Sequence, residues 1–137
     1  DTLDDLKRNL QSLANSISSK LNERQGYLDK ADEIQKVYDR LARDKKTIKE
    51  YRNDIVYFYK ESYNEFKGDN YKYTYKPSIQ DLRDSYDDVI SNIDINLDAL
   101  NNQILSYKNK ASGCLGSLGY MQIAYNSVKT QIQNWTN

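Results

Sequence analysis

The amino-acid sequence predicts an all-α protein, an elongated antiparallel hairpin of two coiled-coil-like helices. In both halves of the chain apolar residues recur at alternating spacings of three and four residues, which is the heptad pattern of paired helices. The 137 residues include only 5 glycines and 1 proline, and Pro77 ends the stretch in which the pattern stops. We therefore predict a single helical-hairpin domain over residues 1–137, with helices at about 2–66 and 78–135 and a turn at about 67–77.

The first predicted helix carries the heptad pattern from its start to the turn. The pattern slips by one residue near Gly26, and a glycine inside a helix costs about 1 kcal/mol relative to alanine. We expect one continuous helix with a weak point near Gly26, and two stacked helices with a break there as the alternative. The predicted buried positions are Leu3, Leu6, Leu10, Leu13, Ile17, Leu21, Leu28, Ala31, Ile34, Tyr38, Leu41, Ile48, Tyr51, Ile55, Phe58 and Phe66.

The second predicted helix has the more regular pattern, and Ser78 offers a cap directly after Pro77. Gly113, Gly116 and Gly119 lie three residues apart within it. They indicate either a small-residue face that a neighbouring helix can approach closely or a bend near Gly113 to Gly119. The predicted buried positions are Ile79, Leu82, Tyr86, Ile90, Ile93, Leu97, Leu100, Ile104, Tyr107, Ala111, Cys114, Leu118, Met121, Tyr125, Val128, Ile132 and Trp135.

Charges on the two sides of the turn favour antiparallel pairing. A basic segment precedes the turn by about the same distance as an acidic segment follows it, so the hairpin places them side by side. Two independently solvated charged faces are the alternative interpretation. The basic residues are Arg40, Arg43, Lys45, Lys46, Lys49 and Arg52, and the acidic ones are Asp87, Asp88, Asp94 and Asp98.

The composition argues against an enzyme and against several kinds of binding site. Because the chain has no histidine and one cysteine, Cys114, histidine-based triads, histidine-containing zinc sites and intramolecular disulfides are impossible. The heptad position of Cys114 predicts a buried structural thiol. The formal net charge of zero and the absence of a long apolar run predict neither nucleic-acid binding nor membrane insertion. We expect no catalytic, cofactor-binding or metal site.

Two features predict a protein partner. First, several heptad positions have a second apolar residue beside them, as in Val37–Tyr38 and Val89–Ile90, so the apolar stripe is wider than one neighbouring helix covers. Second, seven of the 13 tyrosines fall between Tyr51 and Tyr75, around the predicted turn. Rigid amphipathic tyrosines are frequent contact residues at protein interfaces, and packing of these rings within the tip of the hairpin is the alternative interpretation. The candidate partner-binding residues are Tyr71, Tyr73, Tyr75, Leu105, Leu115 and Tyr120.

The sequence at the turn, Glu65-Phe66-Lys67-Gly68-Asp69, places an aromatic residue two positions before a glycine between two long amphipathic helices. This arrangement resembles the W-x-G helical hairpins of type VII secretion in Gram-positive bacteria, and most of all the YwqH-like partner proteins of LXG toxins. Phe66 stands where that family usually has tryptophan. By position, Phe66 would pack at the end of the hairpin, and Gly68 would allow the chain to reverse.

The resemblance implies a small helical adaptor that binds the helical N-terminal region of an LXG-type toxin and targets it for type VII secretion. Such a protein would be cytoplasmic or secreted together with its partner. The alternative hypothesis is a self-associating coiled-coil protein with a structural or tethering role and no link to secretion. Either way the expected partner is a helix, from another protein or from a second copy.

Overall fold

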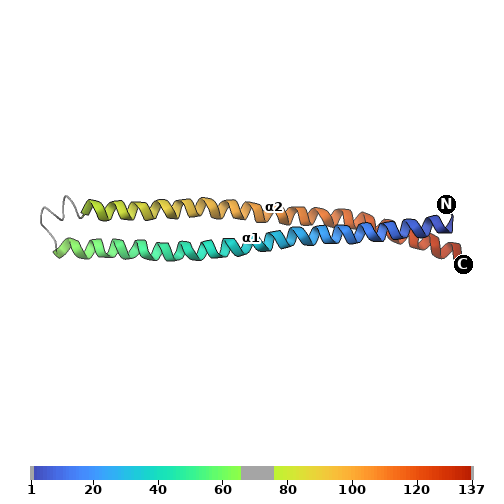
Figure 1. Ribbon diagram of the computed structural model, residues 1–137, viewed down its shortest axis with the longest axis horizontal. Helices are drawn as coiled ribbons and strands as arrows, with labels where there is room; N and C mark the ends of the chain where they lie inside the picture. Colours follow the sequence, from blue (N-terminus) through green and yellow to red (C-terminus); the bar gives the residue numbers. More distant parts are fainter. Residues whose placement is uncertain (1, 66–75, 137) are drawn as a thin grey trace. The chain divides into compact units, whose positions relative to one another are not determined.

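The computed structural model describes residues 2–65 and 76–136, which form two antiparallel helices, α1 and α2 (Figure 1). Helix α1 covers Leu3–Glu65 and helix α2 covers Lys76–Thr136. The described residues contain no strand, so the predicted all-α two-helix hairpin is confirmed. Helix α2 begins at Lys76 rather than at Ser78, which places Pro77 in its first turn. Proline is well suited to that position, because the first N–H groups of a helix have no partner within the helix.

Helix α1 begins with a reciprocal pair of hydrogen bonds known as a capping box. The backbone N–H of Asp5 donates to the hydroxyl oxygen of Thr2 at 3.1 Å, and the backbone N–H of Thr2 donates to the Asp5 carboxylate at 3.1 Å. Both bonds satisfy N–H groups that the first turn of a helix leaves unpaired. The hydrogen bonds from Thr2, and a further one from Arg8, lower the pKa of Asp5. The cap explains why the helix starts immediately after Thr2.

The glycines do not interrupt the helices. Helix α1 is continuous at Gly26, which confirms the continuous helix expected there, and helix α2 is continuous through Gly113, Gly116 and Gly119. At all four glycines a Cβ atom would meet nothing within 4 Å. Each therefore costs α2 or α1 about 1 kcal/mol relative to alanine. Neither a helix break nor the close approach of a described segment accounts for the three glycines of α2.

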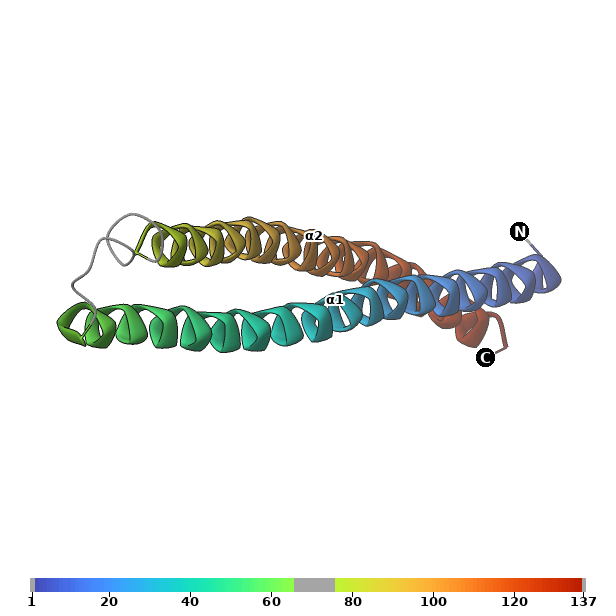
Figure 2. The ribbon, with the colours of Figure 1, turned by 60° about the vertical axis from the view of Figure 1, so that its left-hand side comes forward.

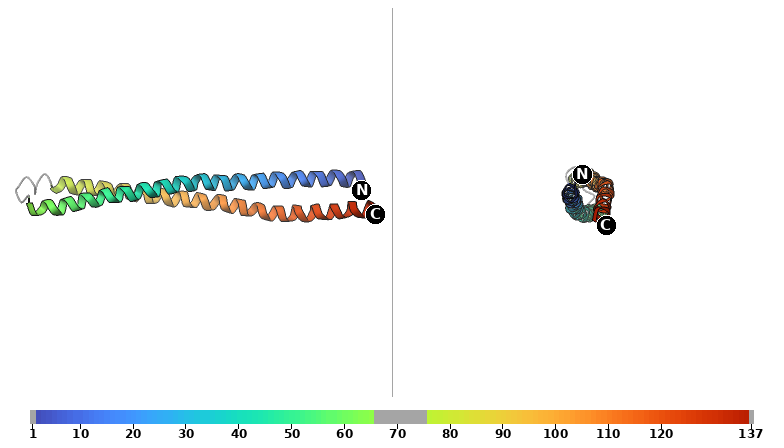
Figure 3. Two further views of the ribbon diagram at one scale, coloured as in Figure 1. Left: turned by 90° about the horizontal axis from the view of Figure 1, so that it is seen from below. Right: turned by 90° about the vertical axis from the view of Figure 1, so that its right-hand side faces the viewer.

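The chain divides into two compact units, in each of which α1 and α2 run antiparallel (Figures 2 and 3). Unit 1 combines Asp1–Ile34 with Gln103–Asn137, and unit 2 is Gln35–Asn102. Each unit has its own line of paired heptad positions, which we call its seam. Residues on the seam are buried or half-buried.

In unit 1 the α1 side of the seam differs from the sequence prediction. Buried and half-buried residues follow the heptad without a slip, so the seam passes through Lys20, Arg24 and Tyr27, and Leu21 lies beside it with 50% of its surface exposed. The predicted slip near Gly26 and the seam position of Leu21 are therefore wrong. Long side chains can bury their stems and keep a polar end at the edge, which lets them occupy such positions. The most buried residues of unit 1 are Leu6, Ala31, Ile104, Ala111, Cys114 and Val128.

In unit 2 the seam is again partly polar. On α1 it includes Lys45 and Arg52, whereas Tyr51 and Phe58, predicted to be buried, are about half exposed. On α2, Leu82 is likewise about half exposed, and its neighbour Arg83 takes the seam position. The best-buried residues of unit 2 are Ile93 and Leu97.

Candidate protein-binding surface

One flank of unit 2 is formed by ion pairs between the helices. Nε of Arg52 donates to Oδ1 of Asp87 at 2.7 Å, and Nη2 donates to Oδ2 at 3.4 Å. The guanidinium therefore forms a bidentate pair with the carboxylate. Lys45 forms an ion pair with Asp94. On each helix the two members lie one heptad apart, which is what antiparallel pairing requires. These contacts confirm that the basic and acidic segments face each other.

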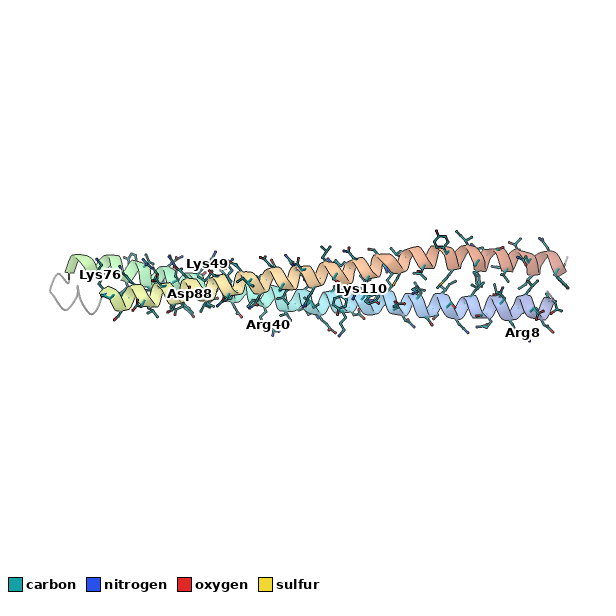
Figure 4. All side chains as sticks on the ribbon, turned by 90° about the horizontal axis from the view of Figure 1, so that it is seen from above. Arg8, Arg40, Lys49, Lys76, Asp88 and Lys110 are labelled. Atoms are coloured by element: carbon teal, nitrogen blue, oxygen red, sulfur yellow. The ribbon has the colours of Figure 1, made fainter. Side chains whose placement is uncertain are left out.

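The geometry of the Arg52 pair changes the proton affinity of both groups. Hydrogen bonding from Arg52 lowers the pKa of Asp87, and the same bond raises the pKa of Arg52. Other charged residues of these segments are exposed to solvent, among them Arg40, Lys49 and Asp88, whose side chains are labelled in Figure 4. Exposed pairs contribute little to stability, so we regard the flank chiefly as setting the register of unit 2.

The other flank of unit 2 is apolar. Large apolar side chains from both helices are each about half exposed there, and we call them the apolar flank. Each of these residues directly precedes the first seam position of its heptad. In an antiparallel pair, the residues of the two helices that occupy this heptad position lie next to each other. The register of the ion pairs accordingly places Tyr51 beside Val89 and Phe58 beside Leu82. The residues of the apolar flank are Val37, Tyr51, Phe58, Leu82 and Val89.

Unit 2 contains a hollow near the start of α2, lined by Ile55, Val56, Ile79, Gln80 and Arg83. Its volume of about 20 Å³ holds little more than one water molecule. A small-molecule site needs several hundred Å³. The apolar flank, which presents side chains over several helical turns, suits a protein segment and not a small ligand.

In unit 1 an aromatic pair joins the helices. The rings of Tyr27 and Tyr107 have centroids 6.3 Å apart, and Nζ of Lys110 lies 5.9 Å and 5.2 Å from these two centroids. Such contacts combine ring packing with cation–π attraction. The charge of Glu23, which accepts a hydrogen bond from the Tyr27 hydroxyl at 3.3 Å, raises the pKa of Tyr27. The two rings therefore occupy seam positions and, together with Lys110, join the two helices of unit 1.

Arg24 is an unusual member of the unit 1 seam. Its Nε atom is buried and has no hydrogen-bond partner among the described residues. The part of α2 in unit 1, from Gln103 onward, contains no aspartate or glutamate that could accept a hydrogen bond from Arg24. A buried donor without a partner lowers stability. Unit 1 therefore contains a polar seam residue without the compensation that Arg52 has in unit 2.

The predicted partner-binding residues fall in two groups. Leu105, Leu115 and Tyr120 are all exposed on α2, Tyr120 to 80%, and Leu115 lies at the same flank of unit 1 as the exposed Leu21. The remaining candidates lie outside the described residues, and they are Phe66, Gly68, Tyr71, Tyr73 and Tyr75.

Sequence reasoning found part of the apolar flank and missed the rest. Val37 and Val89 were recognised because each stands next to a seam residue. Tyr51, Phe58 and Leu82 were missed because they were assigned to the seam itself. A heptad count that admits lysine and arginine to seam positions would have placed all three beside it.

No group of His, Cys, Asp or Glu within residues 2–65 and 76–136 has the arrangement of a metal site. Cys114 is a buried free thiol, as predicted. No helix in the described part of the chain combines the length and apolar character that crossing a membrane requires.

Comparison with family models, with curated proteins and with solved structures finds no match to this chain.

Proposed function

We propose that this chain is a small helical adaptor that binds a helix of another protein along the apolar flank of unit 2. The resemblance at Phe66 and Gly68 suggests the partner, the helical N-terminal region of an LXG-type toxin bound for type VII secretion. The chain would hold that region in a helical assembly until it reaches the secretion machinery, either remaining in the cytoplasm or leaving with it.

The apolar flank carries this proposal. Two helices bury little surface between them, and five large side chains from both helices remain about half exposed on one side of unit 2. A third helix placed against that side would convert the pair into a bundle with its own apolar core. The opposite flank, with the Arg52–Asp87 and Lys45–Asp94 pairs, is already satisfied and needs no partner.

Co-expression with an LXG-type N-terminal region tests the proposal. We expect a one-to-one complex, measured by light scattering on a size-exclusion column. Because the flank residues are exposed, replacing Tyr51 and Val89 together by serine should weaken binding at least about tenfold. The helical circular dichroism of the free chain should not change.

The matched control is Lys49→Ser with Asp88→Ser, which alters two exposed residues outside the apolar flank and should leave binding intact. Absence of any complex between the unmodified chain and the toxin region would disprove the secretion role. Equal binding by both double variants would show that the apolar flank is not the contact surface.

A further inference from the structure

The face of α2 that points away from α1 in unit 1 has an unusual composition. Its most exposed apolar residues are Tyr120, at 80%, and Ile123, at 68%, with Leu105 at 57%. Gly113, Gly116 and Gly119 lie on the same face, since they occupy the outer heptad positions, where a Cβ would meet nothing within 4 Å. We call these six residues the outer face of α2.

The segment that carries all of these residues except Leu105 is also free of charge on every side. Residues 111–128 contain no aspartate, glutamate, lysine or arginine. A helix exposed to water on one side normally carries charged residues on that side, and an uncharged circumference is typical of a helix surrounded by protein. Within the described hairpin, however, only α1 covers this segment. The outer face therefore lacks the neighbour that its composition predicts.

We propose that the outer face of α2 is the contact between two copies of this chain, arranged antiparallel about a two-fold axis at the level of Leu118. This arrangement follows from how large and small residues are spaced. Gly116 and Tyr120 lie equally far from Leu118 along the helix, and so do Gly113 and Ile123. The two-fold axis therefore sets Tyr120 of each copy opposite Gly116 of the other, and Ile123 opposite Gly113.

Such pairing is self-complementary in shape. A contact across a two-fold axis uses the same patch twice, so each protrusion must meet a hollow on the identical patch. Glycine provides the hollow, because it lets a bulky side chain reach the helix backbone. The three glycines, which weaken α2 without any compensation inside the hairpin, gain a structural role in the paired state.

The charges are compatible with a second copy. Beyond Asp98 the charged residues of α2 are Lys108, Lys110 and Lys129. About the axis at Leu118 these fall opposite Val128, Asn126 and Tyr107, so no lysine faces another lysine. This contact is separate from the apolar flank of unit 2, and the proposal does not depend on the function proposed above.

Sedimentation equilibrium of the purified chain, from about 1 µM to about 1 mM, tests the proposal. We expect a reversible monomer–dimer equilibrium. Gly116→Gln should weaken it at least about tenfold, because the long side chain fills the space that Tyr120 of the other copy occupies. The same variant should melt at a higher temperature as a monomer, because glutamine favours helix more than glycine does.

The matched control is Gly26→Gln, which changes a helical glycine of α1 that also has open space around its Cβ position. It should raise the melting temperature similarly and leave the dimer intact. A chain that stays monomeric throughout the concentration range overturns the proposal. So does a dimer that Gly116→Gln weakens no more than Gly26→Gln.

The orientation is tested by disulfide trapping of the full chain in a Cys114→Ala background. When Gly116→Cys and Tyr120→Cys chains are mixed and mildly oxidised, the mixed disulfide should form in preference to either homodisulfide, because only that pair lies within bonding distance. A preference for the Gly116→Cys homodisulfide would indicate parallel pairing and overturn the two-fold arrangement.

Discussion

The two units use the same heptad but connect their helices by different means. In unit 2, ion pairs one heptad apart join the helices at one edge of the seam. In unit 1, the seam contains the nearly fully buried alanines Ala31 and Ala111 together with the Tyr27–Tyr107 ring pair. We expect charge to select the register in unit 2 and side-chain size to select it in unit 1.

This difference also decides which surfaces remain open. In unit 2 the ion pairs of the charged flank join the two helices, and the opposite flank carries five half-exposed apolar residues, while Tyr57 and Ile95 are exposed outside both flanks. In unit 1 the uncharged stretch of α2 is exposed on its outer face, where three glycines and Tyr120 lie. The two units thus expose chemically distinct apolar surfaces, one with large side chains only and one with large and small side chains combined.

The largest effect should come from enlarging the small residues of the unit 1 seam. Ala111 has 2% of its surface exposed, so Ala111→Leu forces extra volume between the helices. We expect a loss of about 1–3 kcal/mol in the free energy of unfolding, measured by urea denaturation. Ala99→Leu, at an exposed position of unit 2, is the control and should change stability little. An unchanged midpoint for Ala111→Leu would show that size does not select the register of unit 1.

A smaller effect of opposite sign is expected at Arg24. Replacing it with methionine keeps an unbranched side chain on the seam and removes the buried Nε atom that has no partner. The variant should be more stable by about 1 kcal/mol in urea denaturation. Arg52→Met is the comparison in unit 2, and because it breaks the pair with Asp87, it should lower the midpoint slightly. If both variants shifted the midpoint in the same direction, the contrast between the two units would not hold.

The fold could be predicted from the sequence because the heptad spacing of apolar residues by itself indicates paired helices. The alternation of three and four residues along both halves, with Pro77 after the interruption, is sufficient for two paired helices. Buried positions on α2 such as Ile93, Leu97 and Ile104 were also identified correctly. An apolar residue at a seam position is the simplest case to recognise.

The details of the surface were harder to predict because apolar residues are not always placed on the seam. On α1 the seam includes Lys45 and Arg52, whose charged ends reach acidic residues at the edge of α2. Counting apolar residues assigns the seam to Tyr51 instead, and so hides a residue of the apolar flank. The ends of long basic side chains are placed by the partner helix, and one helix examined by itself does not contain that information.

The smallest effect is the pH dependence of the charged flank. Hydrogen bonding from Arg52 lowers the pKa of Asp87 below its ordinary value of 3.8. A carboxylate with a lower pKa in the folded state contributes stability above its unfolded pKa, and that stability is lost as the pH falls through the folded value. Stability should therefore decline below about pH 4, and Asp87→Asn should make this decline shallower.

The control for the loss of stability at low pH is Glu23→Gln in unit 1. Glu23 also has a lowered pKa, through a hydrogen bond from Lys20, but this pair lies within α1. Urea denaturation between about pH 2.5 and pH 6 should therefore show a change of slope for both variants. Only Asp87→Asn should also alter the tertiary contacts between the helices of unit 2, measured as chemical-shift changes at Arg52. If the chemical shifts of Arg52 did not change when Asp87 is protonated, the ion pair would not select the register. Side-chain packing would then select it in unit 2, as we expect in unit 1.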